Sequence, residues 1–260
     1  MQKNEAWMGL ASEAFDVRTL NVPRAVAAGV ELLCVTFDFH VTLDAPVFAV
    51  LSDDERVAVA RFLRQEDAIR YAATRVALRH ALGARVGLAA FELQFERDPA
   101  GRPRLAPTKG TDAATPDFNV SHSGRHALIA LAARRRVGVD IEARCADLDW
   151  QTLATAVLTL HEEAHVATLP ADLRADAFYD AWTAKEALLK AIGVGIGGGM
   201  TWFSVLGDET SKPLVRVIDK GARYRNAVKA FDVAWCTAPH GYAACVAWSR
   251  EEMAEPHKGT

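Results

Sequence analysis

The sequence predicts a mixed α/β fold, in which strands and helices alternate along a single chain of 260 residues. Short apolar or alternating runs, which are typical of strands, are separated by longer runs with helical spacing. Two helical segments also resemble each other, residues 75–83 (RVALRHALG) and residues 185–193 (KEALLKAIG), at an offset of 110 residues. The similarity indicates either an internal duplication or two Ala- and Leu-rich helices that each end in glycine.

The composition is that of a globular protein with a core of its own. Half of the residues are hydrophobic, 24% are charged, and the formal net charge is −3. A charge this small favours neither a nucleic-acid partner nor a membrane surface. The four cysteines are scattered without a CxxC pair, so we expect no disulfide framework and no structural zinc site. We see neither a signal-peptide run nor about 18 consecutive apolar residues, so a cytoplasmic protein is expected.

One long helical stretch is predicted within an N-terminal half that we place at residues 1–115. Ser52 is a suitable N-cap, because acidic residues fill the first turn that follows it. Helical spacing then continues with breaks to Leu82, and Gly83 is the expected C-cap. The first 30 residues show no clear period and carry no prediction.

Strands are predicted on both sides of this helical stretch. Residues 31–39 form an apolar run, and residues 91–95 alternate between apolar and polar side chains. Residues 98–116 are rich in Pro, Gly and Thr, which predicts a loop.

The C-terminal half, placed at residues 116–250, is followed by a polar tail at 251–260. Its predicted elements are a strand pair with an Arg-rich turn, a helical region, a glycine-rich break and further strands. In that order they occupy residues 126–133 and 137–142 with the turn at 134–136, about 150–192, 196–199, and 202–248.

The first cluster of chemical interest is Phe118-Asn119-Val120-Ser121-His122-Ser123. A charged His122 can donate to a phosphate, and a neutral one can shuttle a proton. The alternative is a hydrogen-bonded turn at the start of a strand. A Ser–His nucleophile pair is disfavoured, because adjacent strand residues point to opposite faces.

The second cluster is Gly138-Val139-Asp140-Ile141-Glu142. On a strand, Asp140 and Glu142 project to one face while Val139 and Ile141 project to the other. Two neighbouring carboxylates are costly to bury unless a cation joins them, and oxygen ligands of this kind suit Mg²⁺. The alternative is an edge strand with one solvated face.

The third cluster is residues 182–190, Trp-Thr-Ala-Lys-Glu-Ala-Leu-Leu-Lys. Glu186 and Lys190 are four residues apart and share a helical face, which could mean no more than a surface ion pair. In the functional interpretation, Glu186 completes a three-carboxylate site and Lys190 binds a phosphate. Lys185 is expected to lie apart from that face.

The order and spacing of the three clusters resemble those of the 4'-phosphopantetheinyl transferases. The length, with a half-chain before the clusters, is similar to the large monomeric surfactin-synthetase-activating type. Gly101-Arg102-Pro103 fits the Gly-Lys-Pro element of that family, and residues 61–70 resemble its arginine-rich helix. The resemblance covers roughly residues 51–205.

The resemblance implies two similar α/β halves related by a pseudo-twofold axis, with coenzyme A in the cleft between them. It implies Mg²⁺-dependent transfer of the 4'-phosphopantetheine group of coenzyme A to a serine of an apo acyl or peptidyl carrier protein. Adenosine 3',5'-bisphosphate would be released, and the enzyme would act as a monomer.

The resemblance also implies which residues hold the metal and carry the reaction. Asp140, Glu142 and Glu186 would be the metal ligands. His122 and Lys190 would contact the phosphates of the coenzyme. Glu186 would be the first candidate for the base that deprotonates the carrier serine, directly or through a water molecule.

The nucleotide end of coenzyme A would lie further along the cleft. The resemblance implies that Arg102, Pro103 and the backbone near Ser121 hold it, and that Arg70 and Arg56 face its 3'-phosphate.

This sequence departs from the family pattern at two positions near the nucleotide end. The family's usual basic residues are replaced by Glu55 and Ala58, so the contacts of the 3'-phosphate are left open. Arg56 or Arg61 is a possible substitute, because an Arg side chain can reach a phosphate from a neighbouring turn.

Two other functions compete with this interpretation. His161, Glu162 and His165 match the HExxH pattern of zinc hydrolases, and Glu186 lies close to where a third zinc ligand could be. Alternatively, the chain could bind coenzyme A or a carrier protein without turnover. The Arg134–Arg136 turn is either a docking patch for an acidic carrier or a solvated turn.

Overall fold

The computed structural model describes residues 14–107, 115–145, 147–194, 199–207, 213–219 and 223–253. The strands of this part are β1 (Phe15–Thr19), β2 (Val30–Phe37), β3 (Phe95–Arg97), β4 (Pro103–Leu105), β5 (Asp117–Ser123), β6 (His126–Ala132), β7 (Val137–Ala143), β8 (Phe203–Ser204), β9 (Arg216–Val217), β10 (Phe231–Trp235) and β11 (Tyr242–Ser249). The helices are α2 (Pro23–Ala27), η1 (Pro46–Val50), α3 (Asp53–Val59), α4 (Gln65–Val86), η2 (Ala90–Glu92), α5 (Trp150–Val157), α6 (Leu160–Thr168), α7 (Ala171–Ile192) and α8 (Arg225–Lys229). The prediction of a mixed α/β fold is confirmed.

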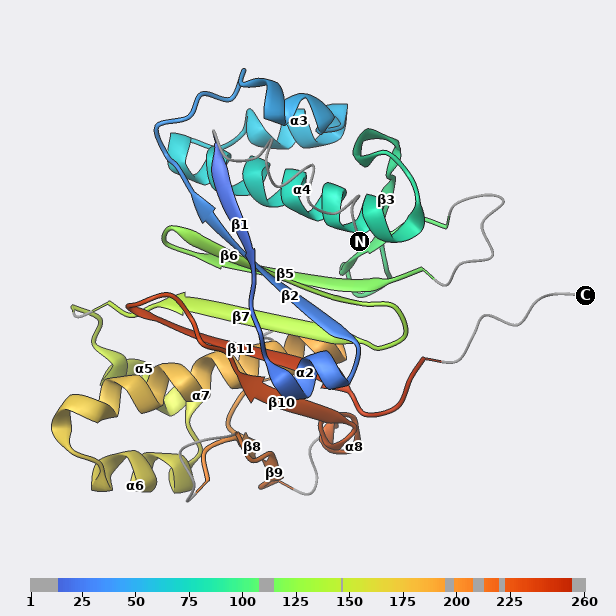
Figure 1. The fold of residues 1–260 in the computed structure, drawn as a ribbon. Coiled ribbons are helices and arrows are strands. Elements are labelled where there is room, and N and C mark those ends of the chain that lie inside the picture. The colour runs from blue at the N-terminus through green and yellow to red at the C-terminus, as the bar shows by residue number, and fades with distance from the viewer. Residues whose placement is uncertain are drawn as a thin grey trace, which may run out of the picture.

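Two antiparallel sheets form the centre of the molecule (Figure 1). The first has the strand order β1-β2-β6-β5 and the second has the order β10-β11-β7. The pairs β3-β4 and β8-β9 form two small additional ladders. Helix α4 lies against the first sheet and α7 against the second, so the long helices lie on the outer faces (Figure 1).

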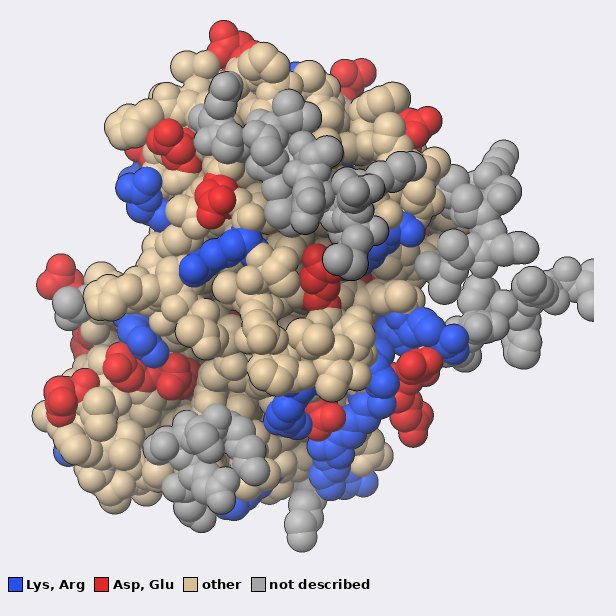
Figure 2. Space-filling view, in the orientation of Figure 1, with Lys and Arg blue, Asp and Glu red and all other residues tan. Residues whose placement is uncertain are grey.

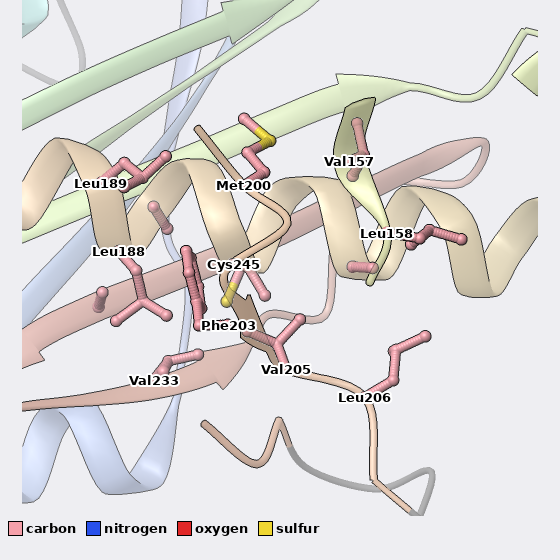
Figure 3. Packing of buried hydrophobic residues seen from close by; sticks show 14 of the residues in the cluster. Val157, Leu158, Leu188, Leu189, Met200, Phe203, Val205, Leu206, Val233 and Cys245 are labelled. Atoms are coloured by element: carbon pink, nitrogen blue, oxygen red, sulfur yellow. The ribbon is translucent and has the colours of Figure 1, made fainter. Parts of the chain in front are cut away.

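Three apolar cores hold these layers together. One fills the space between α4 and the first sheet, and a second lies between α7 and the second sheet. In the second core, Leu188 of α7 packs in one cluster with Phe203 and Val233 (Figure 3). The third core lies between the sheets, where Val139 and Ile141 of β7 are completely buried. Burial of one side of β7 in this core leaves its alternate residues, Asp140 and Glu142, for the α7 side.

The edges of the two sheets meet at β5 and β7, which lie side by side (Figure 1). The two strands belong to separate sheets, and side chains of β5 take the place of a backbone ladder. Every second residue of β5 contributes a side-chain oxygen. The β7 backbone donates to three of these oxygens: from Val137 to Asp117 Oδ2 at 2.8 Å, from Val139 to Asn119 Oδ1 at 2.9 Å, and from Ala143 to Ser123 Oγ at 3.1 Å. This side-chain ladder fixes the register of β7 against β5.

The helix predicted from Ser52 is confirmed at its start and wrong at its end. Ser52 and Glu55 form a reciprocal capping box at the start of α3. Gly83 lies inside α4, which ends instead at Gly87 in the left-handed conformation, with φ 76°. Gly83 is needed for another reason, because a Cβ at this position would approach Leu88 O to 2.7 Å.

The strand prediction for residues 31–39 is confirmed by β2, whereas the predicted pairing of residues 126–133 with 137–142 is wrong. Both segments are strands, but β6 pairs with β2 and β5, and β7 pairs with β11. Turn residues favour a hairpin only locally. Here β2 and β5 occupy both edges of β6, so β6 and β7 do not pair with each other.

Several other segments differ from their predictions. Strand β1 lies in the N-terminal stretch that showed no period, β4 lies in the predicted loop, and η2 covers the start of the predicted strand 91–95. The helical region 150–192 is confirmed as three successive helices, and α8 interrupts the predicted run of strands. The break at 196–199 and the tail at 251–260 lie largely outside the described residues. No helix within the described ranges is long and apolar enough to cross a membrane.

The elements of the two parts of the chain correspond to one another. In the first, β2 pairs with β6 and β6 with β5, and in the second, β7 pairs with β11 and β11 with β10. The helices α4 and α7 each have 22 residues and each end at a left-handed glycine, Gly87 or Gly193. The twofold axis remains a prediction, as does the boundary at residue 115, after which β5 and β6 complete the first sheet.

Candidate active site

Lys190 brings together residues from three distant parts of the chain. Its Nζ lies 2.9 Å from Ser121 Oγ on β5, 2.6 Å from Asp140 Oδ1 on β7, and 3.3 Å from Glu186 Oε2 one turn earlier on α7. Ser121 Oγ donates to the same Asp140 Oδ1 at 2.7 Å. Burial alone would lower the pKa of Lys190, but the carboxylates of Asp140 and Glu186 outweigh it and raise the pKa. Lys190 is therefore a charged ammonium in this cluster.

Three carboxylates, those of Asp140, Glu142 and Glu186, lie near the single ammonium of Lys190. Asp140 is fully buried, and its pKa is raised by burial, with a further contribution from Glu186. Burial and the nearby Asp140 raise the pKa of Glu142 to about 7. Ser123 Oγ donates to Glu142 Oε2 at 2.9 Å, and Trp182 Nε1 donates to Glu186 Oε1 at 3.0 Å. These donors orient the two glutamates.

The donor set fits a hard cation. Asp140 Oδ2 is buried without a hydrogen-bond partner in the described structure, and unpaired buried oxygens of this kind are rare. No three His, Cys, Asp or Glu side chains among the described residues form a metal cage by themselves. Lys190 takes part of the space between Asp140 and Glu186. This arrangement suits Mg²⁺, which uses one or two carboxylates together with phosphate oxygens and waters.

A pocket of about 480 Å³ opens beside this cluster, on the other side of β5. Its walls combine aromatic and apolar side chains with cationic ones. They are formed by Tyr71, Thr74, Arg75, Phe95, Glu96, Arg97, Pro103, Phe118, Asn119, Val120 and His122. Aromatic walls with guanidinium groups are suited to a ligand that has a flat ring and a phosphate.

His122 connects the pocket to the lysine cluster. Its ring lines the pocket, and its neighbour Ser121 contacts Lys190. Partial burial in this concave wall lowers the pKa of His122, and the positive charges of Arg70 and Lys190 lower it further. His122 is therefore poised to gain a proton when an anion enters the pocket.

The arginines predicted for the nucleotide end have different environments. Arg102 is buried, and its guanidinium donates to Asp117 and to the carbonyls of Phe118, Val137 and Lys190. It therefore joins β5, β7 and α7 to one another.

Pro103 lines the pocket. The other two arginines predicted for the nucleotide end, Arg70 and Arg56, donate hydrogen bonds to nearby protein groups. Arg70 donates from Nε to Gly124 O at 3.0 Å and pairs with Asp67. Arg56 donates to Ala49 O at 2.9 Å, and it does not line the pocket. Their roles toward the 3'-phosphate remain predictions.

The sequence analysis assigned no role to Arg75 and Arg97, which line the pocket. It included Ser123 and Trp182 in the clusters but did not predict that they orient the glutamates. The spacing of Trp182 and Glu186, four residues apart on a helix, was a usable signal. Arg75 offered no such signal, because its neighbour Phe95 lies 20 residues away in the chain.

The zinc-hydrolase alternative is wrong. Glu162 is completely buried, accepts from Lys185 Nζ at 2.5 Å, and also accepts from the backbone of Val205 and Leu206. A carboxylate held in this way is closed to water and substrate. His161 is exposed, on a different side of α6 from Glu162.

Comparison with known proteins agrees with the geometry. A model of the 4'-phosphopantetheinyl transferase superfamily matches residues 136–247, and a model of the 4'-phosphopantetheinyl transferase N-terminal region matches residues 44–134. These matches describe a transferase in two consecutive segments.

Individual relatives extend this similarity over most of the chain. The protein slr0495 of Synechocystis sp. is 34% identical over 173 residues, which cover 66% of this chain and 68% of slr0495. The 4'-phosphopantetheinyl transferase HetI of Nostoc sp. is 32% identical over 164 residues, or 61% of this chain and 68% of HetI. The chain belongs to the 4'-phosphopantetheinyl transferase superfamily and is an enzyme of that class.

Among solved structures, the holo-(acyl-carrier-protein) synthase of Bacillus anthracis in complex with CoA (3',5'-ADP) aligns with 47% of this chain and 100% of its own. The TM-score is 0.37 and the identity is 19%.

Proposed function

We propose that this enzyme transfers the 4'-phosphopantetheine group of coenzyme A to a serine of an apo acyl or peptidyl carrier protein, with Mg²⁺ as cofactor. The observation that carries the proposal is the convergence of Ser121, Asp140 and Glu186 on the Lys190 ammonium. These residues come from the three sequence clusters that resemble the family. The adjoining pocket supplies space and chemistry for a nucleotide.

In this proposal the serine hydroxyl oxygen attacks the β-phosphorus of coenzyme A. A bond forms from serine oxygen to phosphorus, the bond from phosphorus to the bridging oxygen breaks, and adenosine 3',5'-bisphosphate leaves. Glu186 accepts the serine proton, directly or through a water molecule. Lys190 and a protonated His122 stabilise the negative charge on the pyrophosphate.

Asp140, Glu142 and Glu186 would hold the magnesium ion. When bound, Mg²⁺ would neutralise the phosphate oxygens and lower the barrier to displacement. The partnerless Asp140 Oδ2 and the raised pKa of Glu142 support a cation at this position.

The carrier-docking surface belongs to the same proposal, with Arg134–Arg136 as the predicted patch. Arg134 and Arg135 pair with Glu252 in the C-terminal segment. Figure 2 shows Lys and Arg side chains gathered into a band at the lower right, where Figure 1 draws α8.

We also propose that the enzyme acts as a monomer of the surfactin-synthetase-activating type, which sedimentation at several concentrations would test.

The proposal is tested by intact mass spectrometry of an apo carrier protein incubated with the enzyme, coenzyme A and Mg²⁺. We expect a gain of one phosphopantetheine group that disappears with EDTA and in Asp140→Ala and Glu186→Ala. His161→Ala is the control and should retain the gain. If several carrier classes show no gain while calorimetry detects coenzyme A binding, the chain is a binding module and the transfer proposal fails.

A further inference from the structure

Arg75 is the most firmly held cation in the wall of the 480 Å³ pocket. Its Nε lies 2.6 Å and its Nη2 lies 2.5 Å from Glu55 Oε1, and its guanidinium carbon lies 4.0 Å from the centre of the Phe95 ring. Only 15% of the side chain is exposed. A guanidinium fixed from two sides loses little conformational freedom when it binds a ligand.

The contacts of Glu55 also explain why an acidic residue stands at a position where the family pattern has a basic one. The same carboxylate accepts from Arg79 Nε at 2.7 Å, and Arg79 Nη1 donates to Ala90 O and Leu93 O. Burial would raise the pKa of Glu55, but Arg75 and Arg79 outweigh it, so the carboxylate is ionised. One negative charge therefore faces two positive ones, and the cluster retains a net charge of about +1.

That surplus charge is directed to the pocket through Arg75. Arg79 is 1% exposed and lies behind it, whereas Arg75 lines the pocket. The Glu55 contacts use Nε and Nη2, so both N–H groups of Nη1 stand outside the ion pair. The acidic residue among those that line the pocket, Glu96, pairs with Arg104 at 2.9 Å.

We propose that Arg75 is the specificity-determining residue for the 3'-phosphate of coenzyme A, and that it replaces the basic side chains that the family pattern has at the positions of Glu55 and Ala58. The inference rests on the proposed function for its ligand, and on Arg75, Phe95 and Glu55 for its place. Phe95 and Phe118, whose rings meet edge to face at 5.7 Å, provide the flat wall beside it.

The test compares coenzyme A with 3'-dephospho-coenzyme A as donors for one carrier protein. For Arg75→Gln, kcat/KM with coenzyme A should fall about 10- to 100-fold, while kcat/KM with the dephospho donor stays within about twofold. Arg75→Lys should recover part of the preference, because it restores the charge without the planar fork. Arg85→Gln, at an arginine of the same helix that pairs with Glu31, is the control and should keep the wild-type preference.

Calorimetry with adenosine 3',5'-bisphosphate and 5'-AMP separates this inference from the transferase proposal, because it needs no turnover. Arg75→Gln should weaken the bisphosphate about 10- to 100-fold and leave 5'-AMP unchanged. An equal effect on both nucleotides, or a preference that disappears in Arg97→Gln instead, would overturn the assignment to Arg75. A wild-type enzyme that transfers nothing but shows the Arg75-dependent binding would overturn only the proposed reaction. Circular dichroism of each variant checks folding. The Arg75 variants should fold, because Glu55 keeps its ion pair with Arg79.

Discussion

The ammonium of Lys185 and the carboxylate of Glu162 lie 2.5 Å apart, and neither side chain is reached by solvent. The first part of the chain contains a corresponding pair, Arg79 and Glu55, at 2.7 Å. In each case the glutamate belongs to a capping box at the start of a short helix, and the cation is the fifteenth residue of a 22-residue helix. The two pairs therefore anchor α4 and α7 in the same way.

Removing the ammonium group of Lys185 should strongly destabilise the fold. Lys185→Met leaves Glu162 buried and unpaired, which costs about 3–5 kcal/mol. Burial would raise the pKa of Glu162, but Lys185 outweighs it and lowers the pKa. Urea unfolding at neutral pH would measure the loss. The double variant Lys185→Met/Glu162→Leu should recover most of it, and a single variant within about 1 kcal/mol of wild type would contradict the anchoring role.

The raised pKa of Glu142 predicts that the free energy of unfolding falls as the pH rises. Its pKa in the folded state is raised to about 7, so the folded state binds this proton more tightly than the unfolded state does. As the pH rises from about 4.5 to 7, ionisation of Glu142 then reduces stability, by about 2 kcal/mol after allowance for solvent screening.

Glu142→Gln removes this titration. The variant should gain about 2 kcal/mol over wild type between pH 5 and pH 8 in urea unfolding with EDTA present. An advantage that does not change with pH would contradict the prediction. Saturating Mg²⁺ should reduce the advantage, because a bound cation stabilises the ionised carboxylate of the wild type.

Asn119 tests the side-chain ladder between the sheets. Asn119→Ala leaves the Val139 N–H without its acceptor, which should cost about 1–3 kcal/mol. Asn119→Asp retains an acceptor oxygen and is the matched control, with a smaller loss. Hydrogen exchange at the Val139 amide reports the bond directly, and unchanged protection in the alanine variant would show that this bond does not hold the strand.

Gly138 tests the contact between β7 and α7. A Cβ at this position would lie 2.1 Å from Ala187 O and 2.5 Å from Ala191 N, so the helix backbone would have to move. Gly138→Ala should therefore cost about 3 kcal/mol or more and separate Lys190 from Asp140. Thermal unfolding and the carrier assay would measure the two effects. Gly101→Asn, where a Cβ meets nothing within 4 Å and asparagine tolerates the positive φ of 83°, should remain near wild type.

The parts of the structure that were predictable depend on neighbouring residues. The capping box of Ser52 follows from a four-residue pattern, and the common face of Asp140 and Glu142 follows from strand alternation. Glu162 shows the limit of such patterns, because its partner Lys185 is 23 residues away and turns an apparent zinc motif into a structural ion pair. The role of Arg75 could not be predicted for the same reason, since the residues that fix its position, Glu55 and Phe95, are distant from it in the chain.

Strand pairing was the least predictable feature. The segments that form β6 and β7 are joined by a short turn, as in a hairpin, yet they do not pair with each other. Strand β6 pairs with its predecessor β5 and with the distant β2, and β7 pairs with the distant β11. Strand β1 has only five residues, too few for a clear period.

The seam between β5 and β7 has a consequence for how this protein can vary. Backbone hydrogen bonds between strands are compatible with almost any residue, whereas hydrogen bonds made by side chains require particular residue types at particular positions. In the heptapeptide DFNVSHS, the first, third, fifth and seventh letters supply the oxygens that cross to β7. In a library that randomises all seven positions, variants that still join the two sheets should be restricted at these alternate letters, while positions 118 and 120 need only remain apolar.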